Sequence, residues 1–354
     1  MILGRRLCRI IFHRCFTHFV DFFILGKFDE GDVGLARFLK AMKTEADISP
    51  TCDEMPAILG ANIVPHANSP LMEQDVPSID NYKIFTMSDG EQVGVIGIDV
   101  MRKTKESSQP DADTILLDEK ETAEAQIKEL TGLGVNKIIL VTHIGFTHDQ
   151  NWIASLDGVD VVFGGDSHSL LGDDKTGLIA SPTGSYATVV EKPNGSKTCV
   201  VQAWEYSKAI GNLDVDFDKD GNVLSCAGSP VFPFNPDVVT VRDADSRYDM
   251  SAADALAVIT SLSESTGGQV KGFTEDADAA SDLEAYAMVV DELTKEVVGF
   301  ASTFIGLKNG GSESGSCDLV AQGFLLGPIS NADVSIQNTG GCRASIEDVS
   351  FLEL

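Results

Sequence analysis

Two strongly apolar segments that each end in a histidine place the tightest constraint on how this chain can fold. Residues 136–143 read NKIILVTH and residues 159–168 read VDVVFGGDSH, with a helical stretch expected between them. Strands that are apolar on both faces and separated by a helix are typical of parallel pairing inside a layered sheet. The sequence therefore predicts an α/β fold in which both segments are buried strands.

The remaining pattern extends this layered fold and adds a second part. Pairs of strands are expected around three turn signals, Asp89-Gly90, Asn194-Gly195 and Asp220-Gly221. The segment SPVFPFNPD carries three prolines in nine residues and is typical of a linker between domains. Helical spacing of apolar residues predicts helices over residues 33–45, 117–131, 251–264 and 281–296.

Charge limits the possible partners. The chain has 26 Lys and Arg against 54 Asp and Glu, a formal net charge of −28. Such a surface repels nucleic-acid polymers and anionic lipid, so neither is an expected partner. It also repels a small anionic substrate unless a cation in the site reverses the local sign. The seven cysteines form no CxxC pair, which argues against a zinc finger or a redox motif.

The first 26 residues are basic and apolar, as targeting segments often are. Arg14, His18 and Asp21 interrupt them, so they are not a clean signal peptide. They also lack a run of about 20 apolar residues, which a membrane span requires. We expect either a targeting segment or a sequence foreign to the fold, and no clear membrane span elsewhere.

The two strand ends carry the residues best suited to chemistry. His143 closes the first apolar segment, and Asp166 and His168 follow the second. Ligands collect at the carboxyl edge of parallel α/β sheets. Gly164 and Gly165 let the backbone turn sharply and approach a ligand closely. The pattern indicates a metal site, although a histidine at a strand end can also be a capped structural residue.

Two weaker candidates stand beside this site. His148 and Asp149 are expected to be exposed residues at the start of a helix. Residues 216–222, DFDKDGN, match the first half of a calcium-binding EF-hand loop, but its closing acid would fall at Ala227. A polar hairpin turn is therefore favoured there.

Six segments together resemble the 5′-nucleotidases. They read GKFDEGDVGLARFL, LGANI, VTHIGFTHD, VDVVFGGDSH, VVQAWEYSKAIGNLDVDFD and SIQNTGGCRASI, and they stand in the order and spacing of that family over residues 28–351. The family consists of two-domain, dinuclear-metal phosphomonoesterases with a calcineurin-like N-terminal domain. The resemblance implies a layered α/β/β/α metallophosphoesterase-like sandwich followed by a second, incomplete α+β domain.

The resemblance also assigns roles to residues. His143 matches a metal-ligating histidine of the family, and His168 matches the last histidine of its GGHSH motif. Asp166 replaces the first histidine of that motif and could still ligate through oxygen, which would favour Mg²⁺, Mn²⁺ or Ca²⁺ relative to Zn²⁺. Asp29 matches the Asp of the family's catalytic His–Asp pair.

The start of the chain departs from the family. The motif GNHEFD carries a metal-binding Asn and a catalytic His, and these positions are Leu25 and Gly26 here. An upstream Asp-x-His is also missing, so we expect a chain truncated at both ends with an incomplete divalent-metal site. Very weak or absent phosphatase activity follows as an expectation.

The second domain matches the family through a glycine-rich loop. Its NxGGxR substrate loop is NTGGCR here, and an arginine in such a loop suits a phosphate or a hydroxyl-bearing ligand. The implied substrate-binding residues are Asn338, Gly340, Gly341 and Arg343. The implied division of the chain is an unmatched segment 1–27, a metallophosphoesterase-like domain 28–228, a linker 229–240 and a substrate-binding domain 241–354.

The expected function is hydrolysis of nucleoside 5′-monophosphates or related nucleotides. In the family, two metals activate a water and neutralise the phosphate oxygens for in-line attack. The alternative is a catalytically inactive relative that binds nucleotides or acts as a scaffold. The resemblance implies an extracellular or cell-surface location, and the sequence gives no oligomeric state.

Overall fold

The computed structural model describes most of the chain in two compact units, residues 1–273 and 274–354. Asp29, the predicted catalytic residue, lies outside the described residues, as do the four residues predicted to bind substrate, Asn338, Gly340, Gly341 and Arg343. The described residues are 31–48, 56–172, 181–242, 247–294, 297–299, 304–306, 314–327, 333–336, 342 and 352–353.

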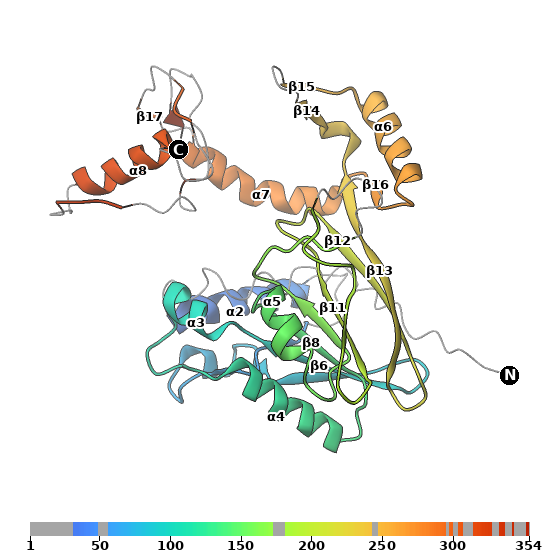
Figure 1. Ribbon diagram of the computed structural model, residues 1–354. Helices are drawn as coiled ribbons and strands as arrows, with labels where there is room; N and C mark the ends of the chain where they lie inside the picture. Colours follow the sequence, from blue (N-terminus) through green and yellow to red (C-terminus); the bar gives the residue numbers. More distant parts are fainter. Residues whose placement is uncertain are drawn as a thin grey trace. The chain divides into compact units, whose positions relative to one another are not determined.

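The centre of the first unit is a six-stranded sheet with the order β10-β11-β9-β8-β6-β5 (Figure 1). Its four inner strands run parallel, and each edge strand pairs antiparallel with its neighbour. The two predicted apolar strands pair directly in parallel, as expected. The strands are β5 (Tyr82–Thr86), β6 (Gln92–Ile98), β8 (Ile138–Thr142), β9 (Val161–Gly164), β10 (Thr188–Glu191) and β11 (Lys197–Gln202).

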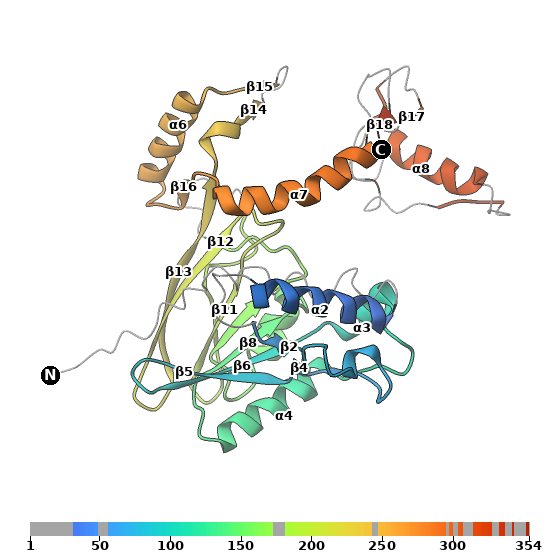
Figure 2. The same cartoon turned by 180° about the vertical axis from the view of Figure 1, so that it is seen from behind.

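Both faces of this sheet are buried, which explains why its inner strands are apolar throughout. Successive residues of a strand point to opposite faces. In β8, Ile138 and Leu140 therefore pack with helix α4 (Glu119–Gly132), whereas Ile139 contacts the opposite layer. The opposite layer is the antiparallel pair of β12 (Ile210–Phe217) and β13 (Val223–Phe234), extended by β16 (Val270–Gly272). Figures 1 and 2 show α4 and β12–β13 on opposite sides of the central sheet. The predicted layered α/β class is confirmed.

The three predicted hairpins are present. They are β5–β6, β10–β11 and β12–β13, and their turn glycines Gly90, Gly195 and Gly221 all have positive φ. In the last turn the carboxylate of Asp218 accepts the backbone N–H groups of Asp220 and Asn222, at 2.9 and 2.8 Å. The turn thus uses this carboxylate to hold its own backbone, which agrees with a polar hairpin rather than a calcium loop.

Helix α4 begins where the sequence predicts, because Asp118 caps it by accepting the N–H of Glu121. Helix α2 (Asp32–Ile48) buries Leu35 and Leu39 against a separate small core that contains Ile58. Its packing partners include two short pieces, β2 (Ile58–Leu59) and the 3₁₀ turn η1 (Pro70–Met72). The remaining short elements here are β3 (Ile63–Val64), β4 (Ile79–Asp80), α3 (Met101–Lys103), the π-helical turn η2 (Thr104–Ser108), β7 (Ile115–Leu116), α5 (Phe146–His148) and the π-helical turn η3 (Asp149–Ile153).

The end of the first unit continues past the predicted linker. Strand β13 covers residues 223–234, and β16 pairs with it in parallel. Helix α6 buries Ala255 and Ile259, and its cap Ser251 accepts the N–H of Asp254. The domain limits predicted from the sequence stay a prediction. The elements that complete this region are the 3₁₀ turn η5 (Pro236–Val238), β14 (Thr240–Arg242), β15 (Arg247–Asp249) and α6 (Ala252–Ser265).

The described residues of the second unit form two helices and a short strand pair. A disulfide joins Cys317 near the start of α8 to Cys342, which lies inside the predicted substrate loop. Val334 and Ile336 alternate with polar residues as in a strand, but no strand is seen at the described residues 333–336. The elements are α7 (Ala277–Thr294), β17 (Val297–Gly299), α8 (Gly315–Leu326) and β18 (Leu352–Glu353), with β17 antiparallel to β18.

A buried carboxylate between two sheet strands should make stability depend on pH. Asp160 is 8% exposed, and its Oδ2 accepts the N–H of Ile138 at 2.8 Å. Burial raises the pKa of Asp160 to about 7, although this hydrogen bond and the nearby ammonium groups of Lys192 and Lys137 oppose the rise. The folded state therefore holds a proton that the unfolded chain releases near its ordinary pKa of 3.8.

The resulting cost to stability grows as pH rises from about 4 to about 7. The variant Asp160→Asn keeps an oxygen acceptor for Ile138 but carries no charge. The difference in free energy of unfolding between this variant and the unaltered chain should depend on pH. We expect it to favour the variant by roughly 2 kcal/mol more at pH 8 than at pH 5. Urea denaturation at both pH values measures this change. A difference between the two proteins that is the same at both pH values would contradict it.

Candidate functional site

Three neighbouring strands deliver ionisable side chains to one edge of the central sheet. Asp99 follows β6, His143 follows β8 and Asp166 lies two residues beyond β9. Because these strands are parallel and adjacent, their carboxyl ends meet at the same edge. The N–H of His143 also donates to the carbonyl of Ile98 at 3.1 Å, which continues the β6–β8 ladder up to the histidine.

The glycine pair at 164 and 165 is required by close packing at this edge. A Cβ on Gly165 would lie 2.7 Å from Nδ1 of His143, and a Cβ on Gly164 would collide with the carboxylate of Asp149. Real Cβ atoms essentially never lie within 3.0 Å of such atoms. Because these glycines have no side chains, the backbone at the end of β9 can lie directly against the side chains of His143 and Asp149, which follow β8.

His143 and Asp166 meet at this edge. Nε2 of His143 lies 3.8 Å from Oδ1 of Asp166, and the two side chains are only 6% and 12% exposed. The same Oδ1 accepts a hydrogen bond from the ammonium group of Lys103. Asp166 is held in the left-handed region with φ 69°, which non-glycine residues seldom adopt. An imidazole nitrogen and a carboxylate oxygen at this separation can share a cation after a small adjustment.

His168 makes its contacts with other residues than His143 and Asp166. Its Nδ1 lies 3.2 Å from Oε2 of Glu205, and its ring meets the ring of Tyr206 edge-on, with centroids 5.3 Å apart. Its side chain is 45% exposed. In the part of the chain that the structure describes, His143, Asp166 and His168 do not form a group whose ligand atoms all lie within 4.8 Å. His168 as a metal ligand stays a prediction.

Two buried carboxyl groups, those of Asp99 and Asp149, lie near His143 and Asp166. Burial raises the pKa of Asp149 to about 7, with a hydrogen bond from Thr142 opposing the shift and the charge of Asp166 adding to it. Burial likewise raises the pKa of Asp99 to about 7, and the charges of Glu119 and Asp166 add to this rise. The expectation that Asp149 is exposed is wrong, because it is fully buried at the start of η3.

Asp149 provides a test of whether a cation fits this edge. Its Oδ1 accepts from Thr142 at 2.5 Å, whereas its Oδ2 has no hydrogen-bond partner among the described residues. An unsatisfied carboxylate oxygen in a buried setting is unfavourable without a positive charge nearby. The ligand atoms of Asp149, His143 and Asp166 do not all lie within 4.8 Å of one another among the described residues, so this oxygen supports a cation at the edge as a nearby polar group and not as a third close ligand.

Two surface loops beside this edge share an unusual backbone. Six described residues other than glycine have positive φ, and five of them lie in the loops after β9 and β11. These strands are parallel neighbours, and the contact between His168 and Glu205 ties the loops together. Such backbone clusters at functional sites. The five residues are Asp166, His168, Trp204, Tyr206 and Ser207.

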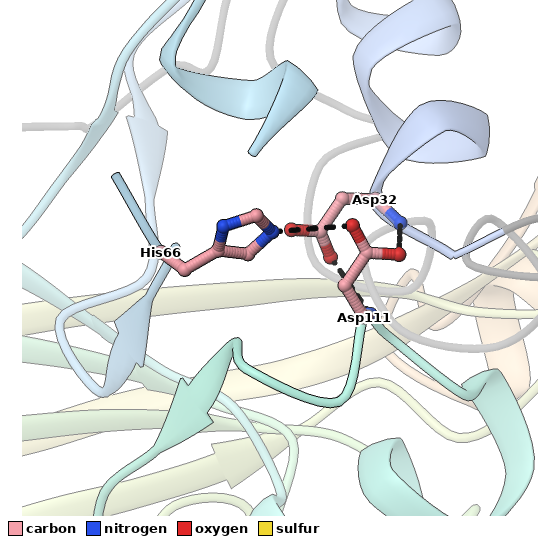
Figure 3. A group of neighbouring side chains, drawn as sticks. All are labelled: Asp32, His66 and Asp111. Atoms are coloured by element: carbon pink, nitrogen blue, oxygen red, sulfur yellow. Dashed lines mark hydrogen bonds and ion pairs between the residues drawn. The ribbon is translucent and has the colours of Figure 1, made fainter. Parts of the chain in front are cut away.

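A second group was not found from the sequence. One ligand atom each from Asp32, His66 and Asp111 lie within 4.8 Å of one another, a spacing that could hold a metal ion. Figure 3 shows the three side chains converging from helix α2, from the segment after β3 and from the loop before β7. These segments lie far apart in the chain and share no motif, so sequence spacing gave no signal.

Hydrogen bonds within this group and to its neighbours give it a structural role. Oδ2 of Asp32 accepts from the hydroxyls of Ser69 and Thr114, the latter at 2.6 Å, and its Oδ1 accepts the N–H of Asp111 at 3.1 Å. Oδ1 of Asp111 in turn accepts the N–H of Asp32 at 3.2 Å, and Nε2 of His66 lies 3.4 Å from the other oxygen. The group therefore fastens the start of α2 to the loop before β7.

An alanine at Gly165 should disturb the edge directly. Its methyl group would press on His143, so we expect Gly165→Ala to lower the free energy of unfolding by about 1–3 kcal/mol, the usual cost of overpacking. Gly132→Ala is the matched control, because a Cβ there meets nothing within 4 Å and the residue ends a helix. Urea denaturation of both variants measures the difference, and equal stabilities would contradict the steric argument.

The described residues contain no helix that is both long and apolar enough to cross a membrane. No family model matches the chain. A probable 5′-nucleotidase of Treponema pallidum is 33% identical over 92% of this chain and 55% of its own length. The NAD 5′-nucleotidase of Haemophilus influenzae is 30% identical over 92% of this chain and 53% of its own length.

The solved structures agree with these sequence relatives. The 5′-nucleotidase precursor of Thermus thermophilus superposes with a TM-score of 0.64 at 29% identity, covering 92% of this chain and 54% of that one. The fold is that of the calcineurin-like phosphoesterases. Within that class, the chain is related to the 5′-nucleotidases, and the resemblance seen in its sequence is confirmed. The chain spans about half the length of the curated relatives it matches.

Proposed function

We propose that this protein hydrolyses the phosphate ester of nucleoside 5′-monophosphates or related nucleotides, with a divalent metal held by His143 and Asp166. The similarity to 5′-nucleotidases over 92% of the chain supports the reaction class. The observation that carries the site is the approach of His143 and Asp166 at the carboxyl edge of the sheet. Mg²⁺, Mn²⁺ and Zn²⁺ are all candidates for the ion.

The chain's own residues define what this edge can do. A metal there would polarise the phosphate and lower the pKa of a bound water. The backbone of His143 is held by the β6–β8 ladder, and the side chain of Asp166 is held by its ion pair with Lys103. The carboxylate of Asp166 gives this edge a negative charge, which favours a cation over an anion there. A nucleotide phosphate therefore needs the cation in order to approach.

Several parts of the proposed site rest on the resemblance alone. Asp29 as the catalytic carboxylate belongs to this proposal, as does the substrate loop of Asn338, Gly340, Gly341 and Arg343. The weak activity expected from the unmatched start of the chain also remains a prediction. His168 contacts Glu205 through Nδ1, so a metal would bind its other ring nitrogen, Nε2.

Two disulfides bear on where the protein works. Cys199 pairs with Cys226, and Cys317 pairs with Cys342. Disulfides persist mainly in oxidising environments outside the cytosol. We therefore propose an extracellular or cell-surface location, with a free nucleotide as substrate. The relatives include snake venom 5′-nucleotidases, which agrees with this location.

The reaction is tested by release of inorganic phosphate from AMP with added Mn²⁺, and again after chelation with EDTA. We expect slow release that requires the metal, and calorimetric binding of AMP that also requires it. Metal-dependent AMP binding without phosphate release would favour the alternative, an inactive nucleotide-binding relative. Phosphate release that is unaffected by EDTA would contradict the metal-dependent mechanism.

A further inference from the structure

The ammonium group of Lys103 lies beside the carboxylate that a cation at this edge would bind. Its ammonium group donates to Oδ1 of Asp166, which is also the oxygen that faces Nε2 of His143. The carboxylate is 12% exposed and the lysine side chain 51% exposed, so the pair lies where the edge opens to solvent. A positive charge of the protein itself therefore already occupies the approach to the shared oxygen.

The backbone that carries Lys103 is held by buried contacts. The lysine ends α3, and the hydroxyl of the next residue, Thr104, donates to Oδ2 of Asp99 at 2.7 Å. Thr104 is fully buried, and Asp99 is 4% exposed. At the start of α3, the N–H of Met101 donates to Oε1 of Glu119 at 2.9 Å. These bonds aim the lysine at the edge and distinguish it from an ordinary surface lysine.

The charges around the pair explain why a cation is needed there. The carboxylate of Asp166 is only 12% exposed, so little water reaches its negative charge. A neutral neighbour would leave this negative charge uncompensated. One ammonium supplies a single positive charge, whereas a divalent ion supplies two, and each needs the same oxygen.

We propose that the ammonium group of Lys103 and a divalent metal compete for Oδ1 of Asp166, so that Lys103 sets the affinity of the site for metal. The inference rests on the metal site of the proposed function. Metal binding then displaces the lysine from the carboxylate.

The competition is tested with Mn²⁺ alone, by calorimetric titration of three purified variants without substrate. We expect Lys103→Met to bind Mn²⁺ about tenfold more tightly than the unaltered chain, since both the occupied oxygen and the charge repulsion are removed. Lys103→Arg keeps the charge and should bind as the unaltered chain does. Lys105→Met is the matched control, because this exposed lysine lies two residues away in the adjoining turn η2.

The outcomes separate this inference from the proposed function. Equal Mn²⁺ affinity in Lys103→Met and the unaltered chain, or weaker binding in the variant, overturns the competition while leaving the metal site in place. Equal tightening in Lys105→Met and Lys103→Met also overturns it, because a general charge effect would then be the cause. Absence of Mn²⁺ binding in every variant overturns both proposals. Thermal melting of each variant confirms that it is folded.

Discussion

Replacement of His143 with alanine is expected to weaken Mn²⁺ binding on the order of 100-fold or more and to abolish measurable phosphate release from AMP. His143 supplies the imidazole nitrogen that faces Asp166 across 3.8 Å. Loss of residues that merely orient a ligand already costs about 10–100-fold in metal affinity, so loss of a ligand itself should cost at least as much. Calorimetry with Mn²⁺ and a phosphate-release assay measure the two effects.

The position of His143 makes this effect specific. It is 5% exposed, and a Cβ on Gly165 would come within 2.7 Å of its ring, so few other side chains can move into its place. The alanine variant should also leave a small cavity. Part of any loss could therefore reflect weakened packing, and urea denaturation must show that the variant is folded under the assay conditions.

His148→Ala is the matched control for this experiment. His148 lies five residues further along the chain, is exposed, and stacks on Trp152 with ring centroids 3.9 Å apart. Its Nδ1 contacts only the carbonyl of Ile144 among the hydrogen bonds seen, so its loss should leave Mn²⁺ binding within about a factor of two. Similar losses in both variants would show that His143 has no special role in metal binding.

The sequence predicted the central layers because their physical causes are local. Apolar strands such as residues 138–142, ended by a histidine and separated by a helix, admit few arrangements other than a parallel sheet covered on both faces. Turn pairs such as Asn194-Gly195 fix hairpins through the positive φ that glycine tolerates. The edge that holds His143 and Asp166 follows directly from the parallel pairing.

Other features depend on contacts between distant segments and could not be predicted. Lys103 and Asp166 are 63 residues apart, and no spacing rule relates a lysine in a short helix to a carboxylate after a strand. Asp149 was expected at the surface because acids at helix starts usually are, but the glycine at 164 lets the next strand end cover it. His168 turns toward Glu205 through a backbone that its residue type rarely adopts.

The second large effect concerns the disulfide between Cys199 and Cys226. Replacing both cysteines with alanine is expected to lower the free energy of unfolding of the first unit by about 3–4 kcal/mol. The bond closes a loop between residues 27 apart in sequence, and chain entropy for a loop of that size gives this magnitude. Cys199 lies in the central sheet and Cys226 in β13, so the bond joins two layers of the fold.

The composition of the chain allows this effect to be measured in one unit alone. Both tryptophans, Trp152 and Trp204, lie in the first unit, so their fluorescence during urea denaturation reports its unfolding. The matched control removes the Cys317–Cys342 bond through Cys317→Ala and Cys342→Ala, which lie in the second unit. That control should leave the tryptophan transition within about 0.5 kcal/mol of the unaltered chain.

Reduction of the unaltered chain provides an independent check. If the bond acts by reducing the conformational entropy of the unfolded chain, dithiothreitol should shift the tryptophan transition of the unaltered chain to nearly that of the double variant. Dithiothreitol should not shift the transition of the double variant itself. The fully buried position of Cys199 makes the variant slightly less stable than the reduced chain, since alanine also leaves a space in the core. A tryptophan transition that neither the substitutions nor reduction alter would mean that β11 and β13 are held together by their apolar contacts alone.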